Sequence, residues 1–306
     1  MTVCIAAISG TAIIGASDRL VTYGDTEYEQ SEPKILQLAS NTVALTSGSP
    51  EAHVRIHSRV STRLVGVTDP TVDQIAEFYA EEFALLRRQK AERKYLTPLG
   101  LTTWSFLNNQ TNLTAAALHT LMEHLAEEDL GSEAIIAGVD QSGPHIYVVE
   151  DPGEATCYDM DGWAAIGSGF RHADQQFIRD KYHRKWAMDE AFLLTYLAKK
   201  RADITPGVGP QTDMFFIGPG PDNRYTLLGA DAQVVQLVRQ LHADLEEQER
   251  ELADNARAKI RDFFTGLAKQ AEQPANQEQV DGAARSARTD DAQEVRGSTT
   301  EGQPSN

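Results

Sequence analysis

Residues 2–18 read TVCIAAISGTAIIGASD, and this stretch decides the fold. Two runs of small and aliphatic residues, 3–8 and 12–16, lie on either side of a Ser-Gly pair that is typical of a tight turn. The stretch therefore predicts two strands of a β-hairpin. Because both runs are apolar at every position, we expect these strands to be covered on both faces.

A regular spacing begins at the start of this hairpin. Asp18 follows Thr2 by sixteen residues, Lys34 follows after another sixteen, and Gly48 after fourteen more. If Met1 is removed, Thr2 carries both a hydroxyl and an α-amine, and the amine can serve as base for the hydroxyl. A nearby Lys would lower the pKa of that amine, a carboxylate would hold the Lys, and a glycine N–H would receive an oxyanion. The spacing thus predicts an N-terminal nucleophile.

The composition excludes several classes of protein. The chain has 306 residues, a net charge of −17 and 41% hydrophobic residues, so it can bury a core but lacks the basic surface that nucleic acids require. It has no signal peptide pattern and no apolar run of membrane-spanning length. With only Cys4 and Cys157, disulfides are not expected, and a cytoplasmic location follows. The eight histidines show no metal-binding spacing, so we expect no metal or cofactor, and His53 is expected on a helix surface.

The order of the predicted elements is strands, helices, strands, helices, strands, helix. A helix is expected to start at Ser49-Pro50-Glu51, and a second at about 71–93. A long charged helix follows from about 231, and from about 270 large hydrophobic residues vanish, which predicts a disordered tail. We therefore expect a domain over 1–230, a helical extension over 231–269, and a tail over 270–306. Two stacked sheets flanked by helices would explain this order.

Five parts of the sequence carry a family resemblance. They are Thr2-Val3, residues 14–19, Lys34-Ile35, residues 44–49, and residues 136–140 leading to 165–169. In these segments the chain resembles the proteasome β-subunit family of N-terminal nucleophile (Ntn) hydrolases, of the bacterial proteasome-related type that begins with Met-Thr. The resemblance covers roughly residues 2–230, in family order. It implies an α+β fold, the four-layer αββα sandwich.

The resemblance also implies roles for individual residues. Thr2 would be nucleophile and, through its amine, base, with Lys34 as the activating charge and Asp18 holding Lys34. The remaining implied roles are the oxyanion hole at the N–H of Gly48, orientation of the amine by Ser168 and Asp203, and substrate binding by Val21, Thr22, Glu32 and Thr46. Thr22 matches a backbone position that pairs with a bound peptide as an added strand. Glu32 would favour a basic substrate side chain, although loop solvation explains it equally well.

Two features depart from the family. The family usually has Ser three residues after the position of Asp203, whereas this chain has Pro206, with Thr205 as a substitute hydroxyl one residue early. Between Gly48 and Ser168 the chain is also longer by several helical turns, centred on residues 99–130.

The function expected from these features is a threonine-type amide-bond hydrolase, a peptidase of a self-assembling proteasome-like particle. Its partners would be a peptide or protein substrate, further copies of the chain and an ATP-dependent unfoldase, with no nucleic acid and no membrane. Two alternatives stay open. One is a small-molecule amidase on the same fold. The other is a catalytically silent assembly subunit.

Overall fold

The computed structural model describes residues 2–23, 26–30, 33–218 and 224–272. It has mixed helix and sheet with a long C-terminal helix, which confirms the mixed class expected from the sequence. The chain divides into two compact units, Met1–His242 and Ala243–Asn306, and each is described by itself. The predicted disordered tail lies almost wholly outside the described residues, which end at Glu272 within the last helix.

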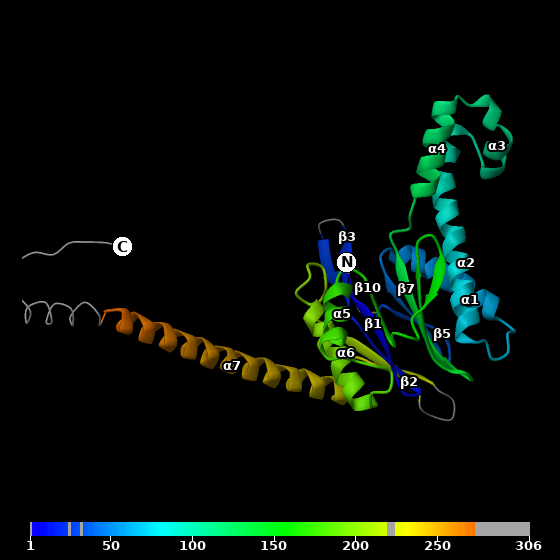
Figure 1. Ribbon diagram of the computed structural model, residues 1–306. Coiled ribbons are helices and arrows are strands. Elements are labelled where there is room, and N and C mark those ends of the chain that lie inside the picture. Colours follow the sequence, from blue (N-terminus) through cyan, green and yellow to red (C-terminus); the bar gives the residue numbers. More distant parts are fainter. Residues whose placement is uncertain (1, 24–25, 31–32, 219–223, 273–306) are drawn as a thin grey trace, which may run out of the picture. The chain divides into compact units, whose positions relative to one another are not determined.

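Strands and helices alternate in blocks along the chain (Figure 1). The strands are β1 (Cys4–Ser9), β2 (Ala12–Ser17), β3 (Leu20–Tyr23), β4 (Thr26–Glu29), β5 (Ile35–Ala39), β6 (Thr42–Ser47), β7 (Glu133–Asp140), β8 (Gly143–Glu150), β9 (Glu154–Cys157), β10 (Trp163–Ile166), β11 (Asp213–Ile217) and β12 (Tyr225–Leu228). The helices are α1 (Pro50–Leu64), α2 (Val72–Ala91), α3 (Thr103–Asn108), α4 (Ala115–Glu127), α5 (Phe170–Arg179), α6 (Met188–Ala202) and α7 (Gln233–Glu272), with short helical turns η1 (Glu92–Leu96), η2 (Thr97–Leu99) and η3 (Gln110–Asn112).

Two antiparallel five-stranded sheets form the centre of the first unit. One has the order β10-β1-β2-β11-β12, and the other the order β5-β6-β7-β8-β9. The hairpin predicted over residues 2–18 is β1–β2, which pairs from Cys4 opposite Ser17 to Ser9 opposite Ala12. The two strands lie inside their sheet, with β10 and β11 as outer neighbours. A separate two-stranded hairpin, β3–β4, was not foreseen from the sequence.

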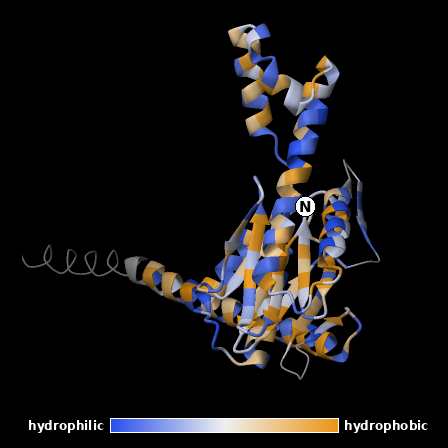
Figure 2. Ribbon diagram, turned by 90° about the vertical axis from the view of Figure 1, so that its right-hand side faces the viewer, coloured by the Kyte–Doolittle hydropathy of each residue, from blue (hydrophilic) through white to orange (hydrophobic). Residues whose placement is uncertain are grey.

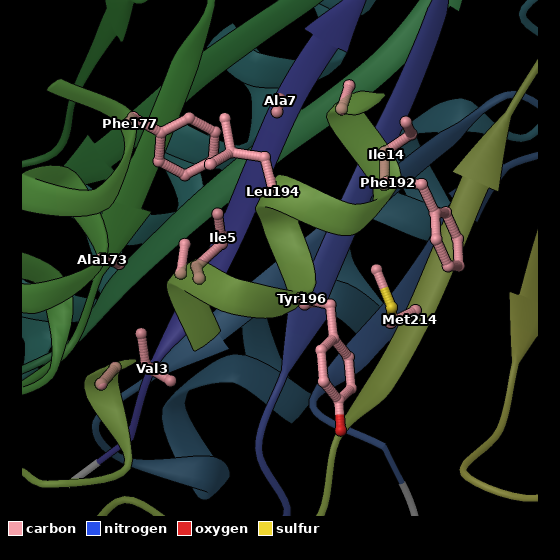
Figure 3. Packing of buried hydrophobic residues seen from close by; sticks show 14 of the residues in the cluster. Val3, Ile5, Ala7, Ile14, Ala173, Phe177, Phe192, Leu194, Tyr196 and Met214 are labelled. Carbon is pink, nitrogen blue, oxygen red and sulfur yellow. The ribbon is translucent and has the colours of Figure 1, made fainter. Parts of the chain in front are cut away.

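Each face of β1 contacts a different hydrophobic core. Val3, Ile5 and Ala7 pack in a cluster with side chains of α5 and α6, part of which Figure 3 shows. The alternate positions, among them Cys4 and Ile8, pack in a second cluster with β6, β7 and β8 of the other sheet. Since successive side chains of a strand point to opposite faces, a strand buried on both sides must be apolar throughout. This explains the uninterrupted apolar run of the sequence.

A third core lies beneath the first two long helices. It joins α1 and α2 to β6, β7 and β8, with Tyr79 and Phe83 of α2 fully buried. Helix α1 begins as predicted, since Ser49 caps it by accepting a hydrogen bond from the N–H of Ala52. Past α2 the chain forms η1, α3 and α4, the segment expected to be longer than in the family. No helix of the described residues is long and apolar enough to cross a membrane.

We predict that Gly15→Ala destabilises the protein by about 1–3 kcal/mol, because the added carbon would overpack the core. A Cβ at Gly15 would lie 2.2 Å from the ring of Phe215 and 2.7 Å from the carbonyl oxygen of Ile5, and the latter belongs to the paired backbone. Gly229→Ala is the matched control, since nothing lies within 4 Å of a Cβ there. Urea unfolding of both variants measures the effect. Equal midpoints for the two would contradict the prediction.

Candidate active site

The β1–β2 hairpin places Thr2 beside Asp18. Its last pair joins Cys4 to Ser17, so the residues just beyond the two strands also face each other. The N–H of Asp18 donates to the carbonyl of Val3 at 3.2 Å, and the N–H of Val3 donates to Asp18 Oδ1 at 3.1 Å. The sixteen-residue spacing between Thr2 and Asp18 is thus the length of one hairpin.

The second sheet contributes Lys34 and Gly48 in the same way. Lys34 immediately precedes β5 and Gly48 immediately follows β6, and these two strands pair with each other. The N–H of Thr46 donates to the carbonyl of Lys34 at 3.0 Å, which continues the ladder to the start of β5. Two hairpins, one from each sheet, therefore end at the same place.

The Asp18 carboxylate is fully buried and accepts five hydrogen bonds. Oδ1 accepts from the hydroxyl of Thr2, the N–H of Val3 (3.1 Å) and Nζ of Lys34 (2.9 Å), while Oδ2 accepts from the N–H groups of Leu20 (3.1 Å) and Gly209 (3.0 Å). A buried charge is tolerated only when it is paired and its lone pairs are satisfied. This site meets both conditions.

The Lys34 ammonium has three acceptors for its three protons. Nζ donates to Asp18 Oδ1, to Oγ1 of Thr2 and to the carbonyl of Leu20, and the side chain is 9% exposed. Oγ1 of Thr2 thus accepts from Lys34 while it donates to Asp18. The hydroxyl lies between an ammonium and a carboxylate. Because the ammonium can only donate and the carboxylate can only accept, the hydroxyl proton points to the carboxylate.

The backbone of Thr2 is held from the other side by the end of β10. Strand β10 pairs with β1 so that Ile166 faces Cys4, which brings the following turn to Thr2. The nitrogen of Thr2 donates to Oγ of Ser168 at 3.3 Å, and the N–H of Gly169 donates to the carbonyl of Thr2 at 3.2 Å. Ser168, which the resemblance assigns to the amine of Thr2, therefore lies within hydrogen-bond distance of the nitrogen of Thr2.

Among the described residues, Asp203 forms no hydrogen bond with Thr2. It follows the end of α6, where it pairs with Nζ of Lys199 at 2.8 Å and with Lys200. Lys199 in turn donates to the carbonyl of Gly209 at 2.6 Å, and the N–H of Gly209 reaches Asp18. Burial lowers the pKa of Lys199 to about 8, although Asp203 opposes this. Asp203 is thus connected to the Asp18 carboxylate through Lys199 and the backbone of Gly209.

The sequence does not single out Lys199, because a Lys four residues before an Asp on a helix is a common surface pair. Its side chain is nevertheless fully buried in the structure. The signal that would have found it is the apolar sequence around it, since Ala198 and Ala202 pack in the core on the same helix.

A cleft of about 210 Å³ opens beside this cluster. Its walls include Thr2, Lys34 and Gly48, together with three residues predicted to bind substrate, Val21, Thr22 and Thr46. The fourth, Glu32, lies outside the described residues.

Only glycine fits at position 48. Its φ of +98° is a conformation that other residues rarely adopt, and a Cβ there would lie 2.1 Å from the carbonyl oxygen of Gly131. The next residue, Ser49, donates through its N–H to Oγ of Ser132 at 3.0 Å. The sharp turn between β6 and α1 is therefore fixed both by glycine and by a side chain of the neighbouring segment.

His53 is buried beneath this turn, and the expectation of a surface position was wrong. Its Nε2 lies 2.7 Å from the carbonyl of Ser47 and its Nδ1 lies 2.8 Å from the hydroxyl of Tyr79. Because a carbonyl can only accept, Nε2 carries the proton and Tyr79 donates to Nδ1. Burial lowers the pKa of His53, so the neutral ring is favoured. It anchors the end of β6 to α1 and α2.

Cys4 is a packing residue of the second hydrophobic core. Burial raises the pKa of its thiol to about 12, and its Sγ lies 3.5 Å from the carbonyl of Thr46. Burial therefore disfavours a thiolate at this position. Within the described part of the chain, no group of three or more His, Cys, Asp or Glu side chains could hold a metal ion.

Comparison with known proteins gives one weak similarity. No protein-family model matches the chain. Over 71 residues, 23% of this chain, the sequence is 37% identical to "Proteasome subunit alpha type-5" of Trypanosoma brucei brucei. The match spans 27% of that relative, so this chain covers well under two thirds of its length. The similarity supports a relationship to proteasome subunits and no finer statement.

We predict that acid weakens the fold partly through His53. The unfolded chain binds a proton at this residue near its ordinary pKa of about 6.5, whereas the folded protein binds it only at lower pH. Below about pH 6.5 the unfolded state therefore binds more protons, and the free energy of unfolding falls as the pH falls. In His53→Gln this contribution disappears, so the fall between pH 7 and pH 5 becomes shallower.

Urea unfolding across this pH range measures the slope. His57→Gln, which alters a less buried histidine of the same helix, is the matched control. An unchanged slope in His53→Gln, or the same change in both variants, would show that His53 does not carry the effect.

Proposed function

We propose that this protein is a threonine-type amide-bond hydrolase with Thr2 as its nucleophile. The observation that carries the proposal is the shared position of the Thr2 hydroxyl, which accepts from the ammonium of Lys34 and donates to the buried carboxylate of Asp18. A hydroxyl held beside an ammonium is placed for activation once a neighbouring base takes its proton, and the α-amine of Thr2 would be that base.

The proposed reaction begins after Met1 is removed, when the nitrogen of Thr2 becomes an amine beside Ser168. The amine takes the hydroxyl proton, and Oγ1 attacks the substrate carbonyl. The N–H of Gly48, on the wall of the same cleft, would stabilise the resulting oxyanion. The C–N bond then breaks, the amine gives its proton to the leaving nitrogen, and an ester remains on Thr2. Water hydrolyses this ester and restores the hydroxyl.

The arrangement of the cores supports the Ntn-hydrolase part of the proposal. Side chains of α5 and α6 pack on one sheet, the two sheets pack on each other, and α1 and α2 pack on the second sheet. We infer that this is the αββα sandwich. In it, Val21 and Thr22 on β3 would pair with an extended peptide substrate. The relative's name, a proteasome subunit, supports assembly of several copies into a particle, and the uptake of peptides is part of the proposal. Substrate delivery by an ATP-dependent unfoldase belongs to the same proposal.

A catalytically silent assembly subunit is the second candidate. Two observations favour it. Asp203 pairs with Lys199 rather than contacting Thr2, and Pro206 stands where the family usually has Ser. Both concern the positioning of the amine, whereas the Thr2–Asp18–Lys34 cluster is complete without them.

We predict that Thr2→Ala abolishes hydrolysis of a small peptide amide, with a loss of at least about a thousandfold, whereas Thr2→Ser retains a measurable rate because it keeps the hydroxyl. Lys34→Met should abolish the rate as well, since it removes the charge next to Oγ1. Fluorogenic peptide hydrolysis gives the rates, and circular dichroism verifies the fold. Intact mass gives the state of Met1. Active protein that retains Met1, or full activity in Thr2→Ala, would overturn the proposal.

We also predict that Lys199→Met lowers kcat about ten- to hundredfold with little change in KM, because the Gly209 backbone that donates to Asp18 loses its anchor. Lys199 acts as a positioning residue. Lys200→Met is the matched control, since Lys200 also pairs with Asp203 but is more exposed and donates to the carbonyl of Pro210, at 3.3 Å, rather than to that of Gly209. Thermal melts separate loss of fold from loss of rate. Equal kcat values in the two variants would show that Lys199 does not position the Gly209 backbone for catalysis.

A further inference from the structure

The second compact unit contains an apolar stripe along one helix. From residue 243 onward, α7 carries Leu245, Leu252, Ala256, Ile260, Phe263 and Leu267, at intervals of seven, four, four, three and four residues. Intervals of three, four and seven place side chains on the same face of a helix. Hydrophobic residues recur along this helix in Figure 2.

This stripe is exposed in the described unit. The exposed fractions of Leu252, Ile260 and Phe263 are 68%, 61% and 64%. These large apolar side chains are costly to leave in water, and Phe264, which lies beside the stripe, is also exposed. The helix therefore has the pattern of one member of a packed pair.

The charges of the same segment are divided between its two halves. Residues 244–254 hold six acidic side chains and one basic side chain, while residues 257–269 hold four basic side chains and one acidic side chain. The helix dipole does not explain the acidic half, because α7 begins at Gln233 and the dipole acts within about the first turn. The two halves are therefore complementary in charge.

We propose that α7 pairs with the α7 of a second copy of this chain, in antiparallel orientation. Antiparallel pairing places each acidic half against a basic half, whereas parallel pairing would place like charges together. Leu245 and Leu267 lie eleven residues on either side of Ala256, so the small residue falls at the two-fold axis, where the helices approach most closely. The stripe spans about 33 Å, enough for three heptads on each helix.

Disulfide cross-linking of the full-length protein tests this pairing. Cys157→Ser removes the exposed native thiol, and Cys4 is buried. In this background, Leu245→Cys and Leu267→Cys are made in two separate preparations of different mass, one of them tagged. Each preparation alone and their mixture are oxidised with diamide. Antiparallel pairing brings residue 245 of one copy to residue 267 of the other, so the mixed dimer forms and each preparation alone stays largely uncross-linked.

Glu247→Cys and Thr265→Cys are the matched control pair, since they lie at equal distances from Ala256 but on the opposite face of the helix. They should give no mixed dimer. Cross-linking of each stripe variant with itself would mean parallel pairing, and absence of any cross-link would mean that another partner or no partner covers the stripe. Either result overturns the proposal. Analytical ultracentrifugation of the Leu252→Glu variant tests the pairing without cysteines. Its self-association should be weaker than that of the unchanged protein.

Discussion

The buried carboxylate of Asp18 is the constraint on which the rest of the first unit depends. An ionised carboxylate without partners would cost several kcal/mol to bury, and here five donors from four parts of the chain remove that cost. Those donors come from the start of β1, the turn after β2, the start of β5 and the Gly209 segment. Each part is fixed relative to the others because it must supply a hydrogen bond to the same two oxygens. The same hydrogen bonds therefore fix both the geometry of the site and the position of the two sheets relative to each other.

This dependence explains what could be predicted from the sequence. A hairpin buried on both faces leaves a strong pattern, and its polar ends, Thr2 and Asp18, are adjacent for any register that keeps the apolar runs paired. Lys34 and Gly48 could be placed because they flank a second hairpin. Strand lengths thus pair Thr2 with Asp18 and Lys34 with Gly48, whereas the meeting of the two pairs was expected from the resemblance. Ser168 was located only by the resemblance, since nothing in strand periodicity links β10 to β1.

The rest depended on contacts that leave no local signal. Lys199 and Asp203 look like an ordinary exposed helix pair, yet the core of α6 surrounds Lys199, and only tertiary packing decides this. The burial of His53 is likewise decided by tertiary contacts, because it depends on Tyr79 of another helix and on a carbonyl of β6. The β3–β4 hairpin carries exposed residues on β4, so its strand pattern has no apolar alternation to detect.

Lys34 pairs with the Asp18 carboxylate and, in the proposed reaction, also activates Thr2. An activity assay alone would not distinguish the loss of one role from the loss of the other. Removing the ammonium leaves Asp18 buried and unpaired, which costs about 3–5 kcal/mol in comparable cases, so a loss of rate must be read with the stability of the variant. Thr2 differs, because without its hydroxyl the carboxylate still pairs with Lys34 and still accepts from the backbone N–H groups. The three-residue cluster moreover uses only the Thr2 side chain and not its nitrogen. Its geometry therefore does not require a free amine, and in the proposed reaction removal of Met1 would add that amine to a site whose hydroxyl is already positioned.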